Sequence, residues 1–266
     1  MDMKSVHVKF SSKWRVLLII LVPAMMFYTL IMMILPSPTL TTNGRADLSG
    51  IDFSHNKLVA LDGQWEFYWD KLLMPEDFDP EQSEKMDSFI TVPGVWSDDA
   101  GMHYSRQGTA TYRLTLYCPS ALKDPAIRIQ NVATAYKLYA NGQLMAEVGK
   151  VSDNKADFKD GEEIHIIDLP KASHEITLVF QVANLNYASG GLRVAPVFRS
   201  KQVLEQQRMI LLVLQLLFIG SVFIFGLYYF LLFLLQNKNR TALLFSILCL
   251  VTVIRSLIWG GAPLMI

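Results

Sequence analysis

The sequence is poor in cysteine, since only Cys118 and Cys249 occur among its 266 residues. Cys249 stands inside an apolar run and Cys118 in the polar middle of the chain, so we expect no disulfide between them. This excludes a scaffold held together by disulfides and a zinc site built from several cysteines. The middle of the chain must therefore fold around a hydrophobic core, which about 170 residues can supply.

Charged residues are absent from two long stretches, Val16 to Leu35 and Met209 to Leu235. Each reaches the roughly 18–20 residues that a helix needs to cross a hydrocarbon core about 30 Å thick. A third apolar stretch, Thr241 to Ile266, is interrupted only by Arg255. We expect Arg255 either to face the interior of a helix bundle or to reach the outer interface. The sequence thus predicts three membrane helices, over 16–35, 201–235 and 241–266. The first residues of the second one, before Met209, lie next to the membrane rather than inside it.

The first apolar run could also be a signal peptide, because a basic arm precedes it. Signal peptides have an apolar region of only about 7–15 residues and end at a small-residue cleavage site. The run in this chain is longer and ends in LPSPTL, so we favour an uncleaved helix. Pro23 lies within it, and a membrane helix tolerates proline because neighbouring groups can bond the carbonyl that proline frees.

Acidic residues are almost absent from both ends of the chain. Of the 24 aspartates and glutamates, all except Asp2 lie between Asp47 and Glu205. The arm 1–15 and the turn 236–240 carry lysine and arginine instead, and short basic loops stay in the cytoplasm. Together with the apolar runs, this distribution predicts a multi-pass membrane protein. The outer segment contains no Asn-x-Ser/Thr glycosylation site, so a bacterial inner (cytoplasmic) membrane suits the sequence. The lipid bilayer is its partner, the arm and the turn are cytoplasmic, and the middle of the chain is extracytoplasmic.

The middle of the chain has the pattern of β-strands. In YKLYANGQL, the pair Asn141-Gly142 between alternating residues is a strong signal of a hairpin. We interpret 36–57 as a polar linker and 58–200 as one all-β domain. About eight short strands separated by Gly, Pro, Asn and Asp turns are typical of a sandwich or jelly roll.

Several patches of this domain, in order, resemble the sugar-binding, galactose-binding-like jelly roll of family 2 glycoside hydrolases. They are LDGQWEFYWD, VPGVW with GTATYRLTL, and IQNVATAYKLYANGQLMAEVG with ITLVFQVAN. The same order resembles the outer domain of bacterial seven-transmembrane receptors with diverse intracellular signalling modules. The apolar runs after residue 208 resemble the first two membrane helices of that receptor family. The resemblance implies a jelly-roll sensor domain, a truncated membrane region, and a cytoplasmic output module beyond this sequence.

The sequence offers few signs of chemistry. Its five histidines have no metal-ligand spacing, and it contains no G-x-S-x-G, P-loop or G-x-G-x-x-G motif. The acidic segment DFKDGEE lacks the spacing of a calcium loop, so we interpret it as a solvated turn. In family 2 hydrolases the catalytic acids belong to a separate barrel, so the resemblance implies a binding fold without an active site. We therefore expect no catalytic residue, no metal, no cofactor and no enzymatic activity.

Two loops combine aromatic side chains with arginine, asparagine or serine, as sugar-binding sites do. The loop 96–107 contains Trp96, Tyr104 and Arg106, and the loop 184–193 contains Asn184, Tyr187 and Arg193. We predict that these six residues contact a ligand, and that the two loops share a pocket if they lie at the same end of the domain. Trp65 alternates with Phe67 and is better explained as a core residue.

The sequence thus favours a membrane-bound sensor that binds a carbohydrate or another small extracellular ligand and signals through its membrane helices. The alternatives are a membrane-tethered carbohydrate-binding or adhesion module, and an accessory domain of a surface hydrolase. We expect no nucleic-acid partner, and the sequence leaves a homodimer open.

Overall fold

The computed structural model describes the β domain and two helices after it. All statements about structure concern these described residues: 36–39, 41–51, 53, 58–78, 85–98, 104–118, 123–130, 132–161, 165–170, 174–235 and 240–259. The predicted basic arm 1–15 and the predicted helix 16–35 lie outside them.

The larger sheet has seven strands and is mainly antiparallel. Its order is β10-β9-β12-β6-β4-β5, and β2 pairs in parallel with the end of β6. The strands are β2 (Arg45–Asp47), β4 (Gly63–Trp69), β5 (Ser88–Val92), β6 (Gly108–Tyr117), β9 (Ala135–Ala140), β10 (Gln143–Val148) and β12 (Glu175–Asn184).

A second sheet has five strands in the order β1-β3-β14-β7-β11. They are β1 (Ser37–Pro38), β3 (Val59–Ala60), β7 (Pro125–Ile129), β11 (His165–Asp168) and β14 (Val197–Ser200). A short pair joins β8 (Val132–Ala133) to β13 (Gly191–Leu192), and two 3-10 turns are η1 (Pro75–Phe78) and η2 (Trp96–Asp98).

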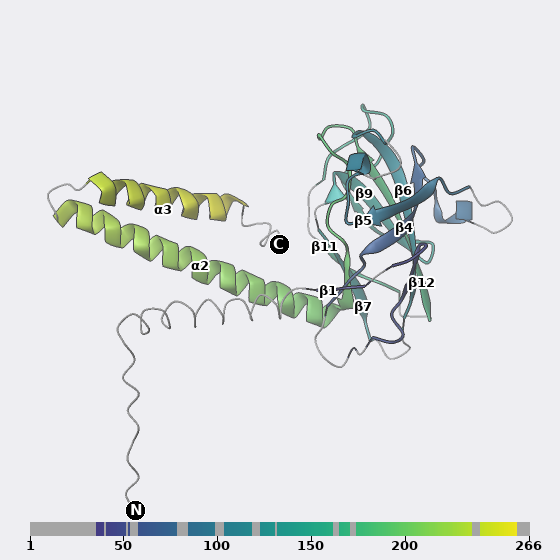
Figure 1. Ribbon diagram of the computed structural model, residues 1–266, viewed down its shortest axis with the longest axis horizontal. Helices are drawn as coiled ribbons and strands as arrows, with labels where there is room; N and C mark the ends of the chain where they lie inside the picture. The colour runs from purple at the N-terminus through teal and green to yellow at the C-terminus, as the bar shows by residue number, and fades with distance from the viewer. Residues whose placement is uncertain are drawn as a thin grey trace, which may run out of the picture.

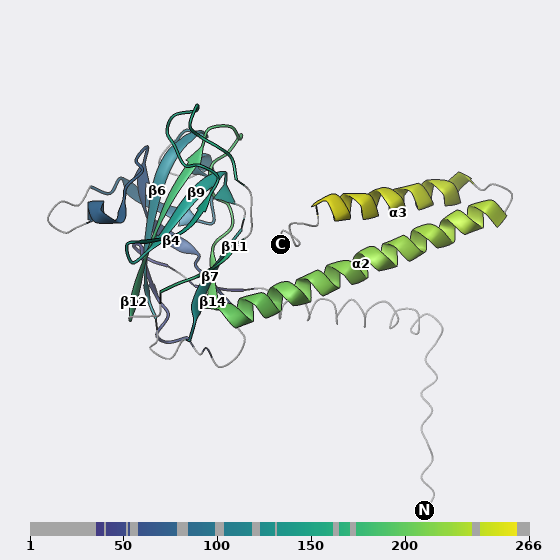
Figure 2. The same cartoon turned by 180° about the vertical axis from the view of Figure 1, so that it is seen from behind.

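The hydrophobic core lies between the two sheets (Figures 1 and 2). Trp65 and Phe180 from the larger sheet belong to the same buried cluster as Ile127 and Phe198 from the smaller one. Trp65 is fully buried, as its alternation with Phe67 predicted, and its ring packs edge-on against Phe180. The described β domain is therefore built from two sheets around one core, as an all-β fold requires.

The predicted hairpin is confirmed. β9 and β10 pair antiparallel around Asn141 and Gly142, which have φ values of 48° and 83°. Positive φ at both central residues is the requirement of a type I′ turn, which asparagine and glycine meet at low cost.

The predicted linker 36–57 is corrected by the structure. Part of it belongs to the β domain, because β1 pairs with β3 and β2 pairs with β6. Ala46 and Leu48 are completely buried in the common core. Such short strands carry too few residues to show a period in the sequence.

Two long apolar helices follow the β domain, α2 (Lys201–Leu235) and α3 (Arg240–Trp259). They form an antiparallel pair that extends away from the sheets (Figures 1 and 2). Both are long and apolar enough to cross a membrane. α2 has the bounds of the predicted helix 201–235, and α3 covers the predicted helix 241–266 as far as Trp259, beyond which that prediction lies outside the described residues. The predicted orientation in the membrane stays a prediction.

Candidate functional site

Three strand ends meet at one end of the larger sheet. Asn184 at the end of β12 pairs with Gly108 at the start of β6, and Trp69 at the end of β4 pairs with Ala110. The loop before β6 and the loop after β12 therefore leave the sheet side by side. The two predicted ligand-binding loops do lie at the same end of the domain.

Asn184 joins these two loops. Its side-chain Nδ2 donates hydrogen bonds to the carbonyl oxygens of Arg106 (2.8 Å) and Tyr187 (3.1 Å). Its Oδ1 accepts a hydrogen bond from the backbone N–H of Tyr187 at 3.0 Å. Both amide donors of the fully buried side chain are thus used within the protein. The predicted role of Asn184 as a ligand contact is corrected, because it positions the loops instead.

Trp96 is also corrected. We expected an aromatic ring on an open loop, but the side chain is fully buried in the core. Its Nε1 donates a 2.6 Å hydrogen bond to the Tyr112 hydroxyl, and its ring lies against Gly190, where an added Cβ would be 2.3 Å away. Because the ring has no exposed face, it cannot stack on a ligand in this conformation.

The open part of the site carries Trp69, Tyr104, Arg106 and Tyr187. Tyr187 is 46% exposed, Arg106 is exposed, and Trp69 and Tyr104 are partly exposed. The Trp69 and Tyr104 rings lie 5.0 Å apart at an interplanar angle of 34°. The Ser88 side chain hydrogen-bonds the Tyr104 hydroxyl at 2.9 Å and holds this ring in place. Exposed aromatic and guanidinium groups on neighbouring loops suit a small polar ligand with a ring.

Arg193 shapes the second loop. Its Nη2 donates to the carbonyl oxygen of Ser189 at 2.6 Å and to the Ser189 hydroxyl at 3.0 Å. Its Nε is buried and has no hydrogen-bond partner among the described residues. Arg193 therefore holds the loop closed on itself, while Tyr187 at the loop tip points to solvent.

Trp69 was not among the predicted site residues. The sequence places it on the same alternating face as Trp65 and Phe67, a pattern that favours the core and gives no sign of exposure. Trp69 is the last residue of β4, and its ring is only partly buried: one side packs against the core, 5.1 Å from the Trp96 ring. Within the described parts of the chain, no group of three histidine, cysteine or acidic side chains could hold a metal ion.

A second feature is the joint between the β domain and the two apolar helices. β14 ends at Ser200 and α2 begins at Lys201, so no linker separates them. Leu204 of α2 is fully buried in a small cluster with Leu58, Ala126 and Val197. The first turns of α2 are therefore packed onto the five-stranded sheet.

Polar contacts reinforce this joint. Arg128 on β7 is 6% exposed and donates a 2.5 Å hydrogen bond to Oε1 of Gln207 on α2. Burial lowers the pKa of the Arg128 guanidinium, because the charged form loses its water. Lys201 forms an exposed ion pair with Asp168 at 2.7 Å. A buried guanidinium bonded to a neutral amide ties the sheet to α2.

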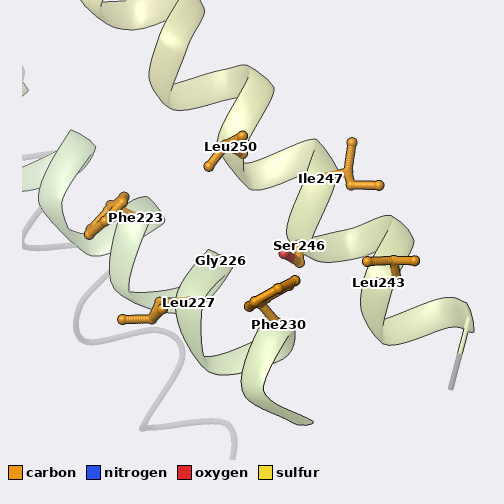
Figure 3. A pocket seen from close by; sticks show the side chains of 8 residues that line it. All are labelled: Phe223, Gly226, Leu227, Phe230, Leu243, Ser246, Ile247 and Leu250. Carbon is orange, nitrogen blue, oxygen red and sulfur yellow. The ribbon is translucent and has the colours of Figure 1, made fainter. Parts of the chain in front are cut away.

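The two helices also form an apolar groove of about 250 Å³ in the half of α2 that lies far from the β domain (Figure 3). Ser246 is the one polar side chain of its lining, so the groove is unsuited to a sugar. The lining residues are Phe223, Gly226, Leu227, Phe230, Leu243, Ser246, Ile247 and Leu250.

Comparison with known proteins finds similarity in structure only. No protein-family model and no curated protein sequence matches the chain. The β-glucuronidase of Ruminococcus gnavus matches with 16% identity and a TM-score of 0.40, over 53% of this chain and 28% of its own. A putative β-galactosidase from Bacteroides fragilis matches with 18% identity and a TM-score of 0.37, over 53% and 23%. A glycosyl hydrolase family 2 member from Bacteroides cellulosilyticus matches with 17% identity and a TM-score of 0.39, over 53% and 20%.

The predicted likeness to family 2 glycoside hydrolases is thus found in part. The chain spans less than a third of the length of these enzymes, and the similarity is too distant to carry an argument about activity. No match supports the predicted likeness to the receptor family, which stays a prediction. One expectation is contradicted: we expected no enzymatic activity, whereas the matching structures are those of glycosidases, which are enzymes. That expectation is withdrawn.

Proposed function

We propose that this protein is a membrane-bound sensor. Its jelly-roll β domain binds a small extracytoplasmic ligand at the loops around Tyr104, Arg106 and Tyr187. Binding changes the conformation of the domain, and the domain passes this change to α2. The observation that carries the proposal is the joint at which β14 continues into α2 without a linker. A module that only had to be tethered would work as well on a flexible connection, whereas a packed joint suits the transfer of strain.

The ligand class follows from the side chains at the loops. Trp69, Tyr104 and Tyr187 offer aromatic surface, and Arg106 offers a charged hydrogen-bond donor. This combination suits a carbohydrate or a similar polar ring molecule of the cell envelope. The site also lies at the end of β12, which pairs with β6 over its whole length. A movement of the loop after β12 can therefore shift both strands and the core side chains that they carry.

The test uses the full chain in lipid nanodiscs. A glycan array identifies the glycans that bind, and calorimetry then measures the affinity for each of them. We expect Tyr187→Ala and Arg106→Ala to weaken binding about two- to thirtyfold, the range expected for one aromatic or cation–π contact. The matched control is Tyr117→Ala, because Tyr117 lies at the opposite end of β6. Unchanged binding in both site variants would exclude this site.

Transmission is tested separately at the joint. Spin labels on Lys155→Cys in the β domain and Leu235→Cys at the far, exposed end of α2 report the distance between the two parts, in a chain that lacks Cys118 and Cys249. We expect the bound glycan to shift this distance distribution. Glycan binding with no shift would refute the sensor and support the tethered carbohydrate-binding or adhesion module.

A further inference from the structure

Arg128 carries a charge into the joint between the β domain and α2. Its side chain stands on β7 of the five-stranded sheet and is 6% exposed. Among the described residues the guanidinium forms no ion pair, and its one hydrogen bond is the 2.5 Å bond from Nη1 to Oε1 of Gln207. Its Nε is buried without a hydrogen-bond partner among those residues. The charge therefore loses its water without gaining a carboxylate.

Such a group opposes the packing in which it is buried. Moving a guanidinium out of water is unfavourable, and a neutral amide recovers only part of the lost hydration. The lowered pKa of Arg128 has the same cause, since burial penalises the charged form. The packed joint is thus less stable than an apolar joint of the same shape would be.

The contacts that hold α2 on the sheet are confined to its first two turns. Leu204 and Gln207 are the buried side chains of α2 before Gly226, and Leu204 belongs to a cluster of four buried residues. The ion pair between Lys201 and Asp168 is exposed, and exposed pairs add little stability. Beyond Gln207, α2 extends away from the sheet (Figure 2). A small apolar cluster therefore balances the unfavourable burial of one charge.

A pivot for detachment lies at the first residue of α2. The backbone N–H of Lys201 donates to the carbonyl oxygen of Asp124 at 3.0 Å, and β14 stays paired with β7 up to Ser200. The helix can therefore turn about Lys201 while the sheet stays intact. This movement separates Gln207 from Arg128 and admits water to the guanidinium.

We propose that the joint is a two-state latch, in which the buried charge of Arg128 favours release of the first two turns of α2 from the sheet. In the closed state the sheet and α2 move together. In the open state Arg128 is hydrated and α2 is uncoupled from the sheet. A packed element with two discrete arrangements is what a conformational switch requires. The latch is a property of the joint and does not depend on the ligand site proposed above.

Thiol labelling of the full chain in lipid nanodiscs tests the latch, in a background that carries Cys249→Ala. Ala126→Cys places a thiol under α2, because Ala126 is fully buried in the cluster with Leu204. The native Cys118, 3% exposed in the core between the sheets, is the control for opening of the whole domain. A water-soluble maleimide labels both thiols, and mass spectrometry of the peptides gives the rate at each position.

The parent chain of this background tests whether the joint opens locally. When opening and closing are fast compared with labelling, the rate measures the population of the open state. Local opening requires less free energy than opening of the whole domain, so the thiol at position 126 should react at least about tenfold faster than Cys118. Equal rates would mean that α2 leaves the sheet only when the domain unfolds, and would overturn the latch.

Two variants test the role of the charge. Arg128→Met together with Gln207→Leu replaces the polar pair by apolar side chains of similar size and should slow labelling at position 126 about tenfold. Gln207→Leu alone leaves the guanidinium buried without its hydrogen bond and should speed this labelling about tenfold. Labelling of Cys118 should stay constant in both variants.

The double variant decides between a latch and a simple tie. If position 126 is labelled as fast as in the parent chain, or faster, the polar pair does not favour release and the latch is overturned. A variant in which Cys118 also reacts faster has lost its fold, and the comparison of the two thiols in the parent chain then decides.

Discussion

Trp96 stabilises the β domain from within, although it stands in a loop next to the ligand-binding residues. Its ring is fully buried and its Nε1 bonds to Tyr112, so Trp96→Ala removes both packing and a hydrogen bond. We expect the free energy of unfolding to fall by about 3–5 kcal/mol, measured by urea titration of the β-sheet circular dichroism. Tyr187→Ala, at an exposed ring, should change it by less than about 0.5 kcal/mol. Equal effects of the two changes would contradict the assignment.

Tyr68 makes stability depend on pH in the alkaline range. Burial, with a smaller contribution from the nearby Glu66 carboxylate, raises the pKa of the Tyr68 hydroxyl to about 12. In the unfolded chain the tyrosine pKa is about 10, so the unfolded chain loses this proton first. The stabilisation is complete below pH 10 and is lost as the pH rises to 12.

The test is urea unfolding at several pH values between 9 and 12. Tyr68→Phe should show a shallower decline than the parent chain. Cys118→Ala is the required background, because burial also raises the pKa of the Cys118 thiol to about 11 and adds its own decline. An identical pH profile with and without the Tyr68 hydroxyl would refute the explanation.

The exposure of individual aromatic residues could be predicted only in part. Trp65 alternates with other apolar residues along a strand, and this period identified it as a core residue. Trp96 and Tyr187 stand in loops where no period exists, yet one is fully buried and the other is 46% exposed. Their burial depends on contacts such as that between Trp96 and Gly190, which join residues far apart in the sequence.

At the scale of elements, the Asn141-Gly142 turn offers a clean test of backbone conformation. Gly142 has a φ of 83° and open space around it, so the cost of Gly142→Ala comes from the backbone alone. We expect a loss of about 1–2 kcal/mol in the free energy of unfolding, again by urea titration. Gly50→Ala is the matched control, because Gly50 also has open space but lies outside the left-handed region, and it should leave stability unchanged or slightly higher. An equal change in the free energy of unfolding for both variants would show that the positive φ of Gly142 does not disfavour a side chain at this position.

Long elements could be predicted from the sequence and short ones could not. The strands β6 and β12 and the helix α2 have enough residues to show a period of two or an unbroken apolar run. β1 and β2 have two and three residues, and their pairing with β3 and β6 depends on the folded domain. The convergence of the two ligand-binding loops depends likewise on the register between β6 and β12, which no local pattern encodes.

At the scale of the whole molecule, the joint determines how the two halves move together. Because Leu204 and Gln207 are buried against the sheet, the first two turns of α2 belong to the β domain as much as to the apolar helix pair. A tilt of the five-stranded sheet must therefore tilt α2 or break the Arg128–Gln207 hydrogen bond. The fold thus permits a mechanical link that a flexible linker would remove.

The orientation of the molecule in the membrane is predicted by its segregated charges. All acidic residues except Asp2 lie between Asp47 and Glu205, and the ends carry basic residues in short segments, which predicts a cytoplasmic location for these segments. A reporter enzyme active only in the periplasm should therefore give activity when fused after residue 150 and none when fused after residue 238. A reporter that is fluorescent only in the cytoplasm should give the opposite pattern and is the control for expression. Activity of the fusion after residue 238 with none after residue 150 would show the opposite orientation, in which the proposed ligand site faces the cytoplasm.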